Sequence, residues 1–120
     1  SSIPEDAGED ILRIIGSEAE IGTQSTVGTY SLEVRESGTI EYIFDEDGVS
    51  GMVFPEIATF RPGSKIIVDG AAYQGGRKTF KLLKAAVISN KSPEITLINF
   101  AEGTKFKWDA SKDEFTVTTP

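Results

Sequence analysis

Short runs of alternating apolar and polar residues recur along most of the chain, and a period of two predicts β-strands. Residues 30–34 and 40–44 show this alternation, with Tyr30 and Tyr42 on the apolar side. Further apolar runs follow at about the 8–12-residue spacing typical of all-β proteins. These runs are 52–54, 57–60, 66–68, 80–88, 95–100, 106–108 and 115–117. Because no strand–helix–strand alternation is visible, the pattern predicts an all-β fold.

Two segments of this pattern are ambiguous: the type of element at residues 11–15 and the end of the strand that contains residues 52–54. Residues 11–15 (ILRII) fit the spacing of an amphipathic helix as well as a buried strand, and the glycines Gly16 and Gly22 favour strands. Pro55 follows the apolar run 52–54. Because Pro has no backbone N–H to donate to a ladder, we expect a strand to end there.

The length of 120 residues allows one domain. Residues 1–10 are acidic and poor in apolar side chains, which predicts a lead-in segment, and residues 11–120 form a single all-β domain. The chain begins Ser1-Ser2-Ile3-Pro4, without an initiator Met and without the apolar run of a signal peptide. We interpret this start as a processed end or as an excised piece of something longer.

Periodicity leaves two all-β architectures open. Glycines and turns recur loosely at the 20–30-residue period of a β-solenoid, in which each turn of the chain, or rung, stacks on the one before. The same strands and turns also fit a β-sandwich or jelly roll. The repetition is too degenerate for the residue pattern to decide between them.

The order of motifs resembles the last rungs of large secreted β-solenoids, namely autotransporter-passenger-like and PEP-CTERM-type surface proteins. The matching pieces are Gly63 to Gly70, Tyr73-Gln74-Gly75-Gly76, Thr79 to Ala86, Trp108-Asp109 and Phe115-Thr116-Val117. The resemblance covers about residues 12–118. It implies a short β-solenoid with stacked rungs and a secreted or cell-surface location. The membrane anchor, sorting tail and translocator barrel of such proteins have no counterpart in this sequence.

Two missing residue types exclude most catalytic chemistry. The chain has no His and no Cys, so Ser-His-Asp triads, thiol nucleophiles, Fe–S clusters, thiolate zinc sites and disulfides are excluded. Carboxylates, Lys, Tyr and Ser remain, without a diagnostic arrangement. With 19 acidic residues, a carboxylate pair at glycosidase spacing arises in any fold by chance. We therefore expect no enzyme activity.

The charge is divided unevenly along the chain. Residues 1–60 hold 13 acidic and 2 basic side chains, a net charge of −11, and residues 61–120 hold 6 acidic and 10 basic ones, a net charge of +4. Such asymmetry is found where a surface meets a complementary one, and it also fits two sets of solvated side chains without a partner. The basic residues are dispersed in the sequence of an acidic chain, which argues against nucleic acid as a partner. No stretch approaches the length of a membrane span.

Three candidate sites carry weak signals. Asp45-Glu46-Asp47-Gly48 resembles the opening of a calcium loop, but of the two further ligands only an acid at Glu56 is present, because Val49 occupies the other position. Asp45 and Asp47 are therefore candidates for weak calcium binding, and no other cofactor is expected.

Tyr73, in a Gly-rich turn, is expected to be the best exposed aromatic for sugar stacking, whereas Trp108 alternates with Lys105 and Lys107 and is expected to pack inward. Asn90-Lys91-Ser92 matches a glycosylation sequon, weakened by the following Pro93.

Together these observations predict a non-enzymatic extracellular structural or adhesive module. Its partners would be copies of itself, neighbouring rungs of a longer chain, or a surface polysaccharide, with end-to-end assembly into filaments. The alternative is a carbohydrate-binding β-sandwich module that uses Tyr73.

Overall fold

The computed structural model describes residues 10–16, 18–20, 26–27, 31–36, 38–89, 93–109 and 112–120. This part of the chain consists of strands and turns and contains no helix, which confirms the all-β fold expected from the sequence. The strands are β1 (Asp10–Ile15), β2 (Glu18–Glu20), β3 (Thr26–Val27), β4 (Leu32–Val34), β5 (Gly38–Ile43), β6 (Met52–Phe60), β7 (Lys65–Asp69), β8 (Thr79–Ser89), β9 (Glu94–Ile98), β10 (Lys105–Asp109) and β11 (Glu114–Thr118). The preference for a strand at residues 11–15 is also confirmed.

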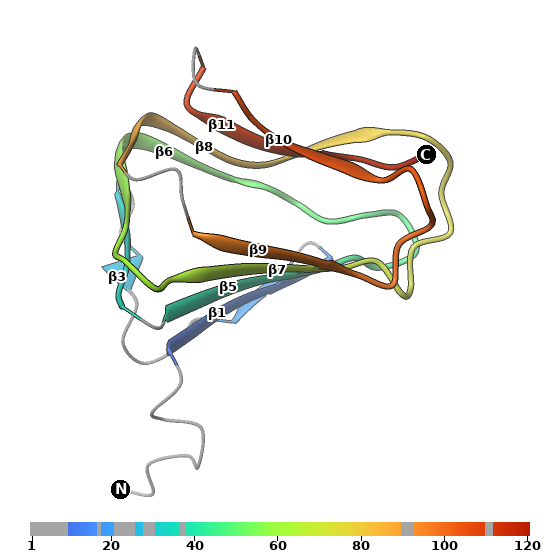
Figure 1. The fold of residues 1–120 in the computed structure, drawn as a ribbon, viewed down its shortest axis with the longest axis horizontal. Helices are drawn as coiled ribbons and strands as arrows, with labels where there is room; N and C mark the ends of the chain where they lie inside the picture. Colours follow the sequence, from blue (N-terminus) through green and yellow to red (C-terminus); the bar gives the residue numbers. More distant parts are fainter. Residues whose placement is uncertain are drawn as a thin grey trace, which may run out of the picture.

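These strands form two sheets that enclose the interior of the molecule (Figure 1). One part of sheet B, with β10 and β11, faces sheet A, and the other part, with β3, turns along the side toward sheet A. Sheet A has the strand order β2-β1-β5-β7-β9, and sheet B has the order β10-β11-β8-β6-β4-β3. The pairs β1–β5, β5–β7 and β7–β9 of sheet A and β4–β6 and β6–β8 of sheet B are parallel. The pairs β1–β2, β3–β4, β8–β11 and β10–β11 are antiparallel. Both sheets are therefore mixed.

From β4 to β9 the chain alternates between the sheets, and each strand lies beside the one formed one circuit earlier. The paired residues are separated by similar lengths of sequence: Ile40 pairs with Ile66, and Ile66 pairs with Ile95. In Figure 1, β9, β7, β5 and β1 consequently lie one behind another. Apart from the antiparallel pairs at the ends, the order of strands across each sheet follows their order in the sequence.

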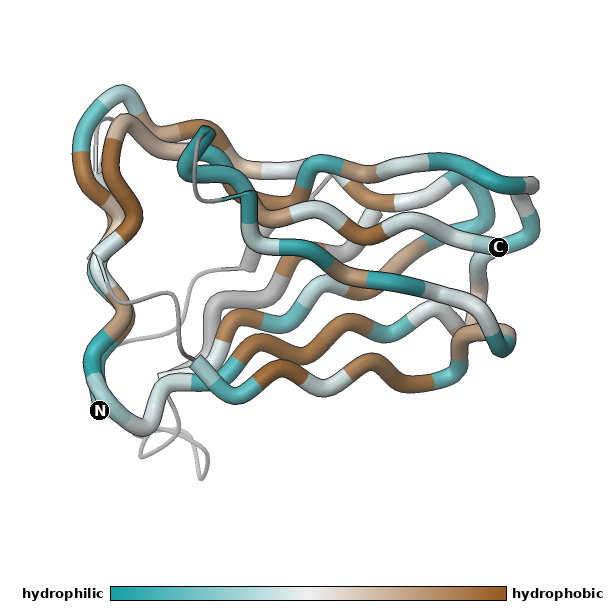
Figure 2. Tube along the Cα trace, turned by 45° about the horizontal axis from the view of Figure 1, so that its top comes forward, coloured by the Kyte–Doolittle hydropathy of each residue, from teal (hydrophilic) through white to brown (hydrophobic). Residues whose placement is uncertain are grey.

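The core lies between the sheets and is built from side chains that repeat in register. Ile40 and Ile66 are neighbours in sheet A, as are Tyr42 and Val68, and all four are fully buried. Sheet B contributes Leu32, Val34, Ala58, Phe60, Phe80, Leu82, Leu83, Ala85, Ile88, Phe115 and Val117. The alternation is visible along the strands in Figure 2 as a change between hydrophobic and hydrophilic colours. A period of two thus places one apolar face of every central strand inside.

The expected strand end at Pro55 is wrong, because β6 runs continuously from Met52 to Phe60. The pairing of β6 with β8 shifts in register between Phe54 and Ile57: Phe54 pairs with Ala85, and Ile57 pairs with Val87. Pro55 lies within this irregularity, where no ladder bond requires its missing N–H. β6 and β8 also turn together part-way along their length in Figure 1.

A second irregularity lies between β8 and β11. Phe115 pairs with Leu83 and Thr116 with Lys81, so Leu82 is an extra residue in β8. An extra residue of this kind leaves backbone groups without a ladder partner. The Leu82 carbonyl accepts a buried hydrogen bond of 2.9 Å from the hydroxyl of Tyr42, which reaches across the core from sheet A. Burial raises the pKa of the Tyr42 hydroxyl well above its usual value, so this side chain stays neutral.

The two sheets end differently on the C-terminal side. Sheet B continues beyond β8 with the hairpin β11–β10, and the half-buried Trp108 of β10 packs on Phe115 and Phe60, with ring centroids 4.6 and 6.0 Å away. The inward packing expected for Trp108 is confirmed. Sheet A ends at β9, which pairs only with β7 within the described part of the chain.

On its outer edge, away from β7, β9 carries the backbone N–H and C=O groups of Ile95 and Leu97. The Glu94 N–H donates to the Ser64 carbonyl, and the Ile98 carbonyl accepts from Gly70, so these groups point to the β7 side. Because successive residues of a strand point their backbone groups to opposite sides, those of Ile95 and Leu97 point away from β7. Their side chains are half-buried against the core. Within the described part of the chain, β9 therefore presents an open strand edge.

Among the described residues there is no helix of the length and apolar character that a membrane crossing requires. Of the lead-in predicted at 1–10, only Asp10 lies within the described residues, where it begins β1.

Candidate functional site

The acidic turn 45–48 follows β5 and is held by its own first residue. The Asp45 carboxylate accepts hydrogen bonds from the N–H groups of Asp47 (2.8 Å) and Gly48 (2.9 Å) through one oxygen, Oδ1. The backbones of Asp45 and Gly48 also bond to each other in both directions. Asp at the start of a turn commonly caps the following N–H groups in this way. The turn thus has a structural explanation in Asp45 itself.

Gly48 closes this turn under a constraint that only glycine meets. Its φ of +127° lies in a region that L side chains rarely adopt. A Cβ placed there would also lie 2.2 Å from the ring of Phe80, which packs directly over the glycine. The absence of a side chain at residue 48 therefore allows the acidic turn to lie against β8.

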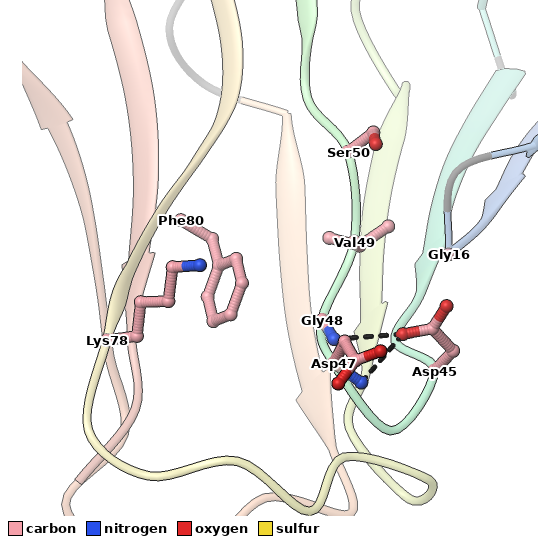
Figure 3. A pocket seen from close by; sticks show the side chains of 8 residues that line it. All are labelled: Gly16, Asp45, Asp47, Gly48, Val49, Ser50, Lys78 and Phe80. Atoms are coloured by element: carbon pink, nitrogen blue, oxygen red, sulfur yellow. Dashed lines mark hydrogen bonds between the residues drawn. The ribbon is translucent and has the colours of Figure 1, made fainter.

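A pocket of about 330 Å³ opens beside the turn (Figure 3). Asp45, Asp47 and Gly48 line one wall, and Lys78 and Phe80 line the opposite one. The Lys78 ammonium lies 5.2 Å from the centroid of the Phe80 ring, within reach of a cation–π interaction. The pocket therefore places carboxylates opposite a single lysine, without a nucleophile and base within hydrogen-bonding distance of each other.

The calcium candidates Asp45 and Asp47 lie together in this wall, but one Asp45 oxygen is already used by the turn. Glu56, the acid expected further along the loop, lies in β6 on an exposed face. No group of three or more acidic residues suited to a metal occurs among the described residues. Calcium binding here stays a prediction that needs a direct test.

Tyr73 belongs to an aromatic cluster centred on Phe44. The Phe44 ring meets Phe80, Phe100 and Tyr73 edge-on, with centroids 4.8, 5.2 and 5.6 Å away. The Tyr73 hydroxyl donates a 2.7 Å hydrogen bond to the Gly76 carbonyl. Tyr73 is half-buried, like Trp108, whereas Phe106 is 44% exposed. A role of Tyr73 in sugar binding remains a prediction.

Two residues of interest from the sequence, Asn90 of the sequon and Tyr30, lie outside the described residues. Tyr42 is part of the core, as the alternation predicts.

The structure gathers one set of side chains that sequence reasoning missed. Lys81 and Lys84 of β8 lie on the same outward face as Lys105 and Lys107 of β10, with β11 between them. In the sequence these lysines are dispersed over 27 positions. Residues 105–109 and 114–118 both alternate polar and apolar side chains and are separated by a short segment. Interpreting them as one hairpin would have placed Lys105 and Lys107 on the polar face of a two-stranded sheet.

Comparison with known proteins gives no match to a family model, to a curated protein or to a solved structure.

Proposed function

We propose that this chain is a short β-solenoid that serves as a non-enzymatic structural or adhesive module outside the cell, assembling end to end with other copies or with further rungs of a longer chain. The parallel, in-register ladders of β1–β5–β7–β9 support this architecture. A jelly roll, by contrast, is built from antiparallel pairs.

The observation that carries the proposal is that strand order follows sequence order in both sheets, apart from the reversed pairs β1–β2 and β10–β11. Among the described residues, those up to 60 carry a net charge of −8 and belong mostly to strands toward one end of the strand order, and those from 61 carry +3 and belong to strands toward the other end. The acidic end of one copy attracts the basic end of another. Because such a contact joins two different surfaces, it can be repeated to form a filament and does not close into a symmetric dimer. Electrostatic attraction would steer the encounter, and strand pairing with apolar burial would hold it.

The open edge of β9 supports the same proposal. Natural proteins protect exposed edges with Lys, Pro or a bulge, because unpaired backbone groups invite another strand. β9 contains neither Lys nor Pro, and its five residues pair with β7 without a register shift. The edge strand of sheet B, β10, does carry lysines, at residues 105 and 107. Of these two C-terminal edges, that of β9 is therefore the less protected.

Sedimentation across a salt series tests the proposal. We expect association at an ionic strength of about 0.01 M, where the Debye length is about 30 Å, and dissociation as salt shortens that length to about 3 Å at 1 M. Leu97→Pro removes an edge-facing N–H and should abolish association. Leu97→Ala is the matched control, because it loses the same side chain but keeps the N–H. A strict monomer at low salt and high concentration would contradict the proposal.

A further inference from the structure

The outer face of the C-terminal part of sheet B is a flat array of lysine and threonine side chains. We name it the lysine face and define it by Thr79, Lys81, Lys84, Lys105, Lys107, Thr116 and Thr118. It is formed by the first half of β8, by β11 and by β10, in that order across the sheet. The apolar partners on the other side of the same strands, such as Phe80, Phe115 and Val117, are buried in the core.

Cross-strand pairing arranges these residues in rows. Lys105 pairs with Thr118, which pairs with Thr79, and Lys107 pairs with Thr116, which pairs with Lys81. Adjacent strands lie about 4.8 Å apart, so the lysines of β8 and β10 flank β11 at a separation of about 10 Å. A hydroxyl-bearing strip along β11 is thus bordered by Lys105 and Lys107 on the β10 side and by Lys81 on the β8 side.

The third row sets one boundary of this strip. Asp109 pairs with Glu114, which pairs with Lys84, so two carboxylates interrupt the lysines there. The Lys81 ammonium lies 3.8 Å from the Glu114 carboxylate, and the Lys84 ammonium donates to the carbonyl of Lys112. The cationic strip therefore runs over the first two rows, with Lys105 and Lys107 at its outer edge.

We propose that the lysine face binds a linear acidic polysaccharide, one that carries carboxylate or sulfate groups, lying along β11. Its exposed lysines complement such a chain in charge. The hydroxyls of Thr79 and Thr118 bond to each other at 2.9 Å, so their remaining hydrogen-bonding capacity and the hydroxyl of Thr116 offer hydrogen bonds to sugar oxygens. The described residues up to 60 hold 10 acidic and 2 basic side chains, a net charge of −8, and repel a polyanion, which confines binding to this end of the molecule.

The chemistry of the face favours a polysaccharide over a nucleic acid. Single-stranded nucleic acids are held by aromatic side chains on which bases stack, and the lysine face has none. The aromatics of β10, Phe106 and Trp108, alternate with its lysines and lie on the opposite side of the hairpin. The face also lacks Arg, the residue whose guanidinium binds phosphate through two parallel hydrogen bonds.

The test measures binding of polygalacturonate and of dextran sulfate at low ionic strength, with neutral dextran as the blank. Lys105→Glu with Lys107→Glu should weaken binding by about tenfold or more, and binding should weaken steeply with added salt. The matched control, Arg35→Glu with Lys65→Glu, makes the same change in net charge at exposed positions elsewhere and should alter binding by less than about threefold. Lys105→Gln with Lys107→Gln repeats the test with a milder change if the first pair fails to fold.

Three results would overturn this inference: no binding of either polyanion, equal losses in the test and control pairs, or equally tight binding of oligo-dT with the same dependence on Lys105 and Lys107. The inference rests on the proposed adhesive role, but the two can fail separately. Polysaccharide binding is measured at protein concentrations at which sedimentation shows a monomer. A failure to bind polysaccharide therefore does not contradict end-to-end association, which is measured separately at higher concentration.

Discussion

Sheet A and sheet B are built from the same alternating pattern but differ in regularity. Every pairing among β1, β5, β7 and β9 keeps one register over its whole length. Sheet B contains two shifts, one near Pro55 and one at Leu82, and its strands β6 and β8 are the longest, with 9 and 11 residues. The comparison shows that the register shifts are concentrated in one sheet, and that at one of them a side chain of the other sheet, Tyr42, bonds to the carbonyl of the extra residue Leu82.

The largest effect is expected at Gly51, where the chain enters β6. A Cβ at this position would lie 1.8 Å from the Lys81 carbonyl oxygen, which is backbone next to the extra residue Leu82. Gly51→Ala should therefore destabilise the protein by more than about 3 kcal/mol in chemical denaturation. Gly76→Ala is the control, because no atom lies within 4 Å of a Cβ there. Equal stability of the two variants would show that the junction has room to move.

The next effect concerns the Tyr42 hydroxyl. Tyr42→Phe leaves the buried Leu82 carbonyl without its hydrogen bond and should cost about 1–3 kcal/mol of unfolding free energy. Tyr73→Phe removes an exposed hydrogen bond to the Gly76 carbonyl and should cost less than about 1 kcal/mol. If both variants unfold at the same denaturant concentration, the irregularity in β8 does not depend on sheet A.

The same tyrosine predicts a dependence of stability on alkaline pH. Burial raises the pKa of folded Tyr42, whereas an unfolded tyrosine ionises near pH 10. Above about pH 10 the unfolded state binds fewer protons, so stability falls by up to about 1.4 kcal/mol per pH unit. Tyr42→Phe should lack this contribution, and the difference in unfolding free energy between the two proteins should shrink from pH 9 to about pH 11. A constant difference over that range would contradict the buried, neutral hydroxyl.

The smallest effect is expected at the acidic turn that follows β5 of sheet A. Calorimetry should show calcium binding no tighter than the millimolar range, because one Asp45 oxygen already caps the turn. Asp45→Ala should lower stability by about 1 kcal/mol through the lost hydrogen bonds, with or without calcium. Micromolar affinity that disappears in Asp45→Ala would establish a metal site here.

Local alternation was sufficient to predict the strands and their buried faces. Leu32, Ile40, Ile66 and Phe115 all point into the core as the period of two requires. The strand end predicted at Pro55 was wrong because a strand can continue through Pro where the register shifts and no N–H is needed. Whether the register shifts there depends on the partner strand β8. Strand pairing is not a local property of sequence, so the position of an irregularity was not predictable.

The surface was harder to predict than the core for the same reason. Lys81 and Lys107 lie on the same face because both pair with Thr116, one from each side, in sheet B. Tyr73 lies in a glycine-rich turn, which suggested exposure, but Phe44 and Phe80 draw its ring into an aromatic cluster. In both cases the deciding contacts join residues far apart in the chain.

The regular spacing of paired residues has a consequence for folding kinetics. Ile40 must find Ile66, and Ile66 must find Ile95, so each step closes a segment of similar length and of similar entropic cost. The first pairing of two neighbouring segments is the slow event, and later segments add to an existing template at a cost that does not grow with chain length. A protein lengthened by further circuits would therefore have a nucleation barrier of nearly unchanged height.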